Sequence, residues 1–156
     1  MLLLLSLGLA AEPETIVGDD GLTIRYFVPH DVDAVRAVLD DTDKVYGLSP
    51  DLVSYTVEDE GSCDAVTTEA RGLLSNLRMH TERCKTSDTS WRDRLVSSED
   101  FDQYEVSWAV SAVEGGTVIT YHLKAELSIP VPDKVMYAKA GEAALNQLNN
   151  LYRSLE

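Results

Sequence analysis

Histidine and cysteine are the side chains of this sequence best suited to metal binding or nucleophilic chemistry, and their spacing argues against both. His80 and Cys84 are four residues apart, which on a helix would place two metal ligands on one face. The residues around them alternate as in a strand, where the same spacing spans about 13 Å. His30 and His122 lie on other predicted elements. The sequence therefore predicts no metal site and no cofactor.

Catalytic motifs are also missing from the sequence. It has no G-x-S-x-G, no P-loop and no Rossmann glycine pattern. "DDTDKVYGLSPD" has the acidic content of a calcium loop, but Val45 occupies the position where that loop requires glycine. An enzyme can still work by placing polar groups around a substrate, and Arg83, Tyr104 and Tyr121 are conceivable for this. Nothing in the sequence selects them over ordinary core residues, so no catalytic residue is assigned.

The charge of the chain limits its partners. Acidic residues outnumber basic ones 27 to 13, giving a formal net charge of −14. Such a surface repels the phosphates of nucleic acids and anionic lipid headgroups, so neither is expected as a partner. The bases gather locally, and two interpretations remain open: solvated strand faces, or a docking patch for an anionic group or a protein partner. Within residues 71–94 they are Arg71, Arg78, Arg83, Lys85, Arg92 and Arg94.

The N-terminus "MLLLLSLGLAAEPE" predicts an exported protein. Residues 1–11 are too short to span a bilayer and match the apolar region of a signal peptide, with small residues before the expected cleavage point. A periplasmic or secreted location follows, without stable membrane insertion of the mature chain. No Lys or Arg precedes the leucines, so a cytoplasmic location is the alternative if the leader does not function. Residues 12–21 are expected to form a flexible linker.

The rest of the chain must position any site. Residues 22–28 alternate as a strand, a short helix follows Asp31, and from Leu52 the pattern has period two for about 75 residues. A long amphipathic helix then begins near Asp133 and is the largest element able to cover the apolar face of a sheet. These patterns predict an α+β fold. A curved antiparallel sheet of about seven strands would wrap around the C-terminal helix, with one or two short helices after the first strand.

Three stretches carry a resemblance to a known family. They are "VPHDVDAVRAVLDDTDKVYGLSPDL", "GGTVITYHL" and the ending "PVPDKVMYAKAGEAALNQLNNLYRSLE". The chain resembles the START-like (SRPBCC, helix-grip) superfamily, which includes polyketide cyclases and lipid-transfer START domains. The resemblance covers residues 22–156 and implies an internal cavity, between sheet and helix, that binds an apolar or amphipathic small molecule.

Strand parity identifies the side chains expected to face this cavity. Arg83 falls on the inward face near the end of its strand, where it would meet a carboxylate or phosphate at the cavity mouth. An arginine that extends to solvent at the sheet rim is equally consistent. The alternative for the other residues is that they simply fill the core. The expected ligand-binding residues are Val66, Met79, Arg83, Tyr104, Trp108 and Tyr121.

Cys63 and Cys84 are predicted on the outward face of neighbouring strands. In an exported chain this placement permits a disulfide, whereas in a cytoplasmic chain two free thiols are the simpler interpretation.

The leading functional prediction is binding or carriage of a hydrophobic or amphipathic small molecule or lipid. One alternative is a polyketide cyclase-like enzyme acting in the same cavity. The other is a protein-interaction module with a packed interior.

Overall fold

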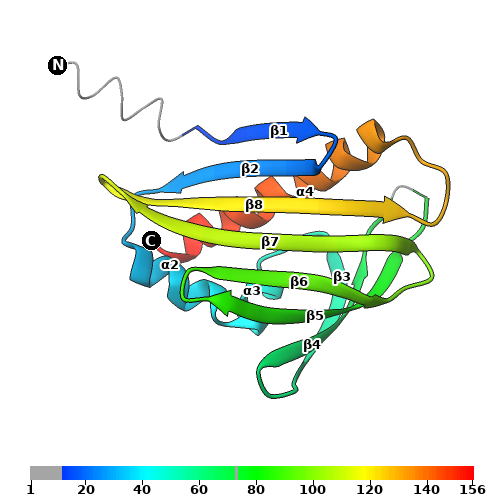
Figure 1. Ribbon diagram of the computed structural model, residues 1–156, viewed down its shortest axis with the longest axis horizontal. Helices are drawn as coiled ribbons and strands as arrows, with labels where there is room; N and C mark the ends of the chain where they lie inside the picture. Colours follow the sequence, from blue (N-terminus) through cyan, green and yellow to red (C-terminus); the bar gives the residue numbers. More distant parts are fainter. Residues whose placement is uncertain (1–11, 73) are drawn as a thin grey trace.

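The computed structural model describes residues 12–72 and 74–156, so the predicted signal peptide lies outside the described residues. Along the chain, one pair of strands is followed by two short helices, six further strands and one long helix (Figure 1). The strands are β1 Glu14–Gly18, β2 Gly21–Val28, β3 Leu52–Asp59, β4 Cys63–Ala70, β5 Leu77–Ser87, β6 Ser90–Ser97, β7 Phe101–Val113 and β8 Gly116–Leu127. The helices are α2 Val32–Leu39, α3 Thr42–Gly47 and α4 Asp133–Ser154.

All eight strands form one antiparallel sheet in the order β1-β2-β8-β7-β6-β5-β4-β3. The sheet curves around α4, which runs along its concave side (Figure 1). Strand β2 joins the far end of the meander by pairing with β8. This is the predicted α+β helix-grip arrangement, with eight strands in place of about seven.

The additional strand lies where the sequence predicted a flexible linker. Glu14–Gly18 pairs with β2 through a two-residue turn closed by Gly18 and Gly21, and Gly21 has a φ of 115°. All five residues of β1 are exposed. Backbone hydrogen bonds to β2 hold this strand in place. Because none of its side chains is buried, it lacks the alternation of apolar and polar residues from which a strand is predicted.

The two short helices begin at aspartate caps. The carboxylate of Asp31 accepts a hydrogen bond from the backbone N of Ala34 at 2.9 Å, and Asp41 accepts one from Lys44 at 3.2 Å. Each cap satisfies a free N–H of the first helical turn. The short helices place the buried residues Val38, Leu39 and Val45 against the sheet.

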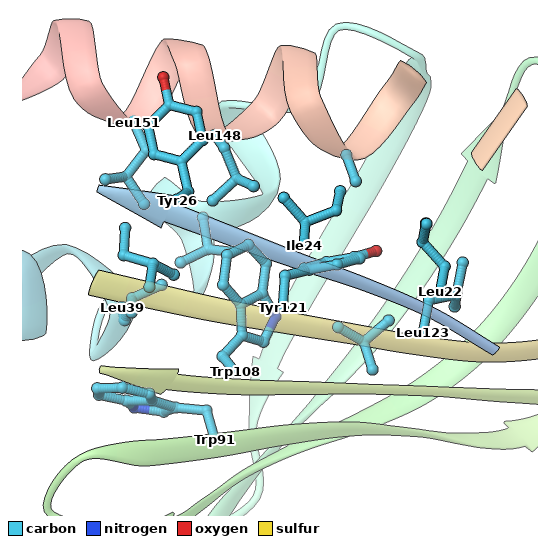
Figure 2. Close-up of a cluster of buried hydrophobic side chains, with 14 of the residues drawn as sticks. Leu22, Ile24, Tyr26, Leu39, Trp91, Trp108, Tyr121, Leu123, Leu148 and Leu151 are labelled. Carbon is cyan, nitrogen blue, oxygen red and sulfur yellow. The ribbon is translucent and has the colours of Figure 1, made fainter. Parts of the chain in front are cut away.

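The core lies between α4 and the concave face of β2, β8 and β7 (Figure 2). Leu22 and Ile24 of β2 and Leu148 of α4 have no exposed surface. Figure 2 shows Trp108 and Tyr121 close together on β7 and β8. Their ring centroids are 5.0 Å apart and their planes are nearly perpendicular. Within the described part of the chain, no helix is long and apolar enough to cross a membrane.

Candidate binding cavity

A cavity of about 370 Å³ lies between the sheet and the helices. Side chains from α3, α4 and strands β3 to β8 form its wall. Its volume falls in the range of small-molecule sites, which is about 300–1,000 Å³. At one end its wall includes the exposed side chains of Leu74 and Ile129, so the cavity reaches the surface near the β4–β5 connection and the start of α4.

The helix side of the cavity owes its space to small residues. Ala140, Ala143 and Ala144 of α4 line the wall, followed one turn later by Gln147. Their spacing of three and four places them on one face of the helix. Because alanine carries only a methyl group, this face of α4 cannot fill the space beneath it.

Four of the six predicted binding residues line the cavity, and they come from three strands. They are Met79, Tyr104, Trp108 and Tyr121. Val66 points inward and is 1% exposed, but it packs outside the cavity wall. Strand parity correctly predicted that Val66 lies on the buried face. It could not show whether this position along the strand reaches the cavity.

Arg83 is buried as parity predicts, but it is at neither of the two expected locations. Its Nη1 lies 2.9 and 3.0 Å from the two carboxylate oxygens of Asp93, and its Nη2 donates to the backbone oxygen of Leu39 at 2.9 Å. The guanidinium carbon is 5.8 Å from the ring centroid of Trp108. Arg83 is 3% exposed and does not line the cavity. The prediction that Arg83 lies at the cavity mouth is therefore wrong, because its direct register partner on β6, the buried Asp93, holds it inside.

That partner, Asp93, is a site residue that the sequence analysis missed. Asp93 is 4% exposed and lines the cavity. Its carboxylate also accepts a hydrogen bond from the indole Nε1 of Trp108 at 3.2 Å. The signal was available in "SWRDRLVS", where Asp93 shares strand parity with Trp91 and Leu95. An acid on an apolar strand face indicates either an ion pair or a site.

Three tyrosines surround this carboxylate. Tyr104 and Tyr121 were predicted; Tyr46 of α3 was not, because its loop-like surroundings hid its inward direction. Burial raises the pKa of all three phenols, and the negative charge of Asp93 raises it further. The hydroxyls therefore stay protonated at neutral pH and act as hydrogen-bond donors or acceptors.

The histidines lie elsewhere. His80 and His122 are on the outer face of the sheet, where each Nδ1 meets a threonine hydroxyl at 2.9 and 2.8 Å respectively. His30 packs its ring edge against Tyr152. Among the described residues, the cavity wall contains no histidine.

The basic segment is spread over different environments. Arg71 is an exposed side chain at the open end of the cavity, as is Lys139 of α4, which lies outside the segment. The other exposed bases of the segment pair with acids, which supports solvated strand faces in place of one cationic patch. These pairs are Arg78–Glu69, Lys85–Asp40, Arg92–Glu105 and Arg94–Glu82.

Cys63 and Cys84 are direct register partners on β4 and β5. Their Cα atoms are 4.4 Å apart and their sulfurs form a disulfide with an S–S distance of 2.11 Å. Glu82 lies beside them on the same face. The sulfurs are bonded to each other and are not thiolates, so this group is not assigned as a metal site.

Comparison with known proteins identifies the fold. No protein-family model and no curated protein matches the sequence. Solved structures match at low identity. A START superfamily protein from Mycobacterium smegmatis has 13% identity and a TM-score of 0.74, covering 85% of this chain and 94% of that one. The Zhui aromatase/cyclase from Streptomyces sp. R1128 has 10% identity and a TM-score of 0.67, covering 92% and 94%.

A third solved structure extends this group. The STAR-related lipid transfer protein from Xanthomonas axonopodis has 16% identity and a TM-score of 0.65, covering 92% of this chain and 90% of that one. Identities this low show the fold alone. They confirm the START-like, polyketide cyclase (SRPBCC) fold that the resemblance in the sequence predicted.

Proposed function

Starting from this START-like fold, we propose that the protein binds or carries a hydrophobic or amphipathic small molecule or lipid between its sheet and α4. The observation that carries the proposal is the cavity of about 370 Å³, which reaches the surface and is not filled by side chains. A lipid-transfer protein and a START superfamily protein share the fold, which supports the same use of this cavity. A protein-interaction module would have needed a packed interior.

The walls favour an apolar body in the ligand. Leu77, Met79 and Val106 on the sheet face the alanines of α4 across the cavity. Transfer of apolar surface from water to such walls contributes about 25 cal/mol for each Å² buried. Specific polar groups are few and gather around Asp93, so the bulk of the affinity would come from the hydrophobic effect.

A cyclase-like enzyme is the second candidate, because two aromatase/cyclases share the fold. The ionisable groups of the cavity favour binding without turnover. Asp93 is held by Arg83 and Trp108, and the raised pKa values of Tyr104 and Tyr121 keep these phenols protonated. Protonated phenols are not suited to accept a proton from a substrate at neutral pH.

We further propose that the protein acts outside the cytoplasm. The apolar leader in residues 1–11 and the disulfide between Cys63 and Cys84 both support an oxidising, extracytoplasmic compartment. Mass measurement of the intact chain recovered from the periplasm or culture medium tests this. Export predicts loss of the leader, and full-length protein confined to the cytoplasm would contradict it.

The test of binding is native mass spectrometry followed by organic extraction of the purified protein. We expect a stoichiometric apolar or amphipathic adduct. Ala143→Leu adds bulk to the cavity wall and should reduce the bound fraction, whereas Ala138→Leu on the exposed face of α4 should leave it unchanged. A mass without adduct, together with no binding of an uncharged dye such as Nile red, would refute the proposal. Recovery of a chemically altered ligand after incubation would favour the enzyme.

A further inference from the structure

The tyrosine hydroxyls in the interior of this protein differ in whether the protein supplies them with a hydrogen-bond partner. Where a tyrosine packs away from the cavity, its hydroxyl has a partner: Tyr26 donates to Asn149 at 2.5 Å, and Tyr137 donates to a backbone oxygen at 3.2 Å. The hydroxyls of Tyr104 and Tyr121 differ, because these residues line the cavity and their hydroxyls have no hydrogen-bond partner among the described residues.

Buried hydroxyls without partners are unusual in native proteins. Tyr121 is only 5% exposed, and Tyr104 lines the same cavity wall. Leaving such a group unpaired costs about 1–3 kcal/mol. Tyr104 and Tyr121 stand on the adjacent strands β7 and β8. A polar group inside the cavity would satisfy hydroxyls that the protein itself leaves free.

The ion pair beside these hydroxyls has a definite orientation. Asp93 lines the cavity, whereas Arg83 lies behind it, turned to the backbone oxygen of Leu39. Three N–H···O contacts reach the carboxylate, two from Arg83 and one from Trp108. A carboxylate has about four acceptor sites, so one remains for a donor in the cavity. A ligand in the cavity can therefore contact the carboxylate of Asp93, but it cannot reach the guanidinium of Arg83 behind it.

This orientation selects among ligand groups. A carboxylate or phosphate would face Asp93 with like charge and without access to Arg83. An ammonium group would have to give up its hydrating water, and the carboxylate of Asp93 would compensate little because Arg83 already neutralises it. A hydroxyl is uncharged, can donate to Asp93, and can bond with the free hydroxyls of Tyr104 and Tyr121.

We infer, on the basis of the proposed function, that the ligand is an apolar molecule with an uncharged alcoholic or phenolic hydroxyl, which it places beside Asp93 at the inner end of the cavity. Molecules of the same shape that carry an anionic group in that position are rejected. This replaces the prediction from sequence that Arg83 receives a carboxylate or phosphate.

Three probes of matched shape test the inference: 2-naphthol, 2-methylnaphthalene and 2-naphthoate, each competing with Nile red for the protein. One additional satisfied hydrogen bond to a charged acceptor predicts that 2-naphthol binds about ten-fold more tightly than 2-methylnaphthalene. We expect 2-naphthoate to be the weakest competitor of the three.

Variants then connect the preference to the hydroxyls. Tyr104→Phe and Tyr121→Phe keep the ring shape and should reduce the advantage of 2-naphthol to about two-fold when combined, while 2-methylnaphthalene binds as before. Each single variant is measured as well, in case the combined tyrosine variant is poorly folded. Tyr55→Phe is the matched control, because its hydroxyl lies outside the cavity and donates to the backbone of Asp43.

The outcomes separate the two proposals. Equal affinities for 2-naphthol and 2-methylnaphthalene, or tightest binding of 2-naphthoate, would overturn the ligand class and leave cavity binding intact. Failure of all three probes and of Nile red to bind would overturn the proposed function itself. A preference for 2-naphthol that survives in the tyrosine variants would overturn the assignment to these hydroxyls.

Discussion

Replacement of Arg83 by methionine would remove the positive member of the buried ion pair and leave its partner unpaired. The side chains of Arg83 and Asp93 are 2% and 6% exposed, so solvent cannot compensate the remaining carboxylate. Loss of one partner of a buried ion pair costs about 3–5 kcal/mol. A domain of this kind has a total stability of about 5–15 kcal/mol, so the variant would lose a large part of it.

Asp93→Leu is expected to cost a similar amount, because it leaves the guanidinium of Arg83 buried. The double variant Arg83→Met and Asp93→Leu leaves no buried charge. Its remaining loss of stability comes from the unpaired indole N–H of Trp108 and the unpaired backbone oxygen of Leu39. Each of these unpaired groups costs about 1–3 kcal/mol. We therefore expect the double variant to be more stable than either single variant.

Urea unfolding followed by tryptophan fluorescence and by circular dichroism measures these free energies. The two probes should give coincident transitions in each variant, as two-state unfolding requires. If the destabilisations of the single variants simply add in the double variant, the two side chains are energetically independent and the structural reasoning is refuted. A cost below about 1 kcal/mol for Arg83→Met would show that its charge is not buried in solution.

Two further predictions concern the backbone of the fold. Gly141→Ala should raise the free energy of unfolding by about 1 kcal/mol, since alanine is the better helix former and its Cβ would lie 3.6 Å from Leu22, an ordinary contact. Gly116→Ala is the contrasting control in the same urea assay and should lower the free energy of unfolding, because its Cβ would lie 2.1 Å from a backbone oxygen. A lower free energy of unfolding in Gly141→Ala would contradict the packing of α4. Replacement of Cys63 and Cys84 by serine should cost about 3 kcal/mol, because the disulfide closes a loop of sequence separation 21. Identical masses of the exported protein after alkylation with and without reduction would show that this bond does not form.

Much of the fold follows from local patterns. Residues that alternate with period two necessarily point to opposite sides of a strand, so the inward direction of Tyr104, Trp108 and Tyr121 could be predicted without a structure. The cap at Asp31 is equally local, because its side chain reaches a backbone N–H only three residues away. The facing placement of Cys63 and Cys84 also followed from parity, although their exact register did not.

The errors arose where a segment has no burial pattern of its own or where its neighbours come from distant parts of the chain. Strand β1 is exposed throughout and has no apolar pattern, so only its pairing with β2 reveals it. Tyr46 faces the cavity because α3 packs over the sheet, and the sequence near it shows no period that would indicate this. Parity alone could not show that Val66 lies beyond the end of the cavity wall.

The sequence by itself determined the order of the elements and the face on which most side chains lie, because both depend on backbone geometry over a few residues. Only the tertiary structure decided that a cavity remains and that Arg83 is committed to Asp93. Both depend on how α4, α3 and strands from opposite parts of the chain fill space together. The volume left between packed elements and the partner of a buried charge are properties of that packing, and no local pattern encodes them.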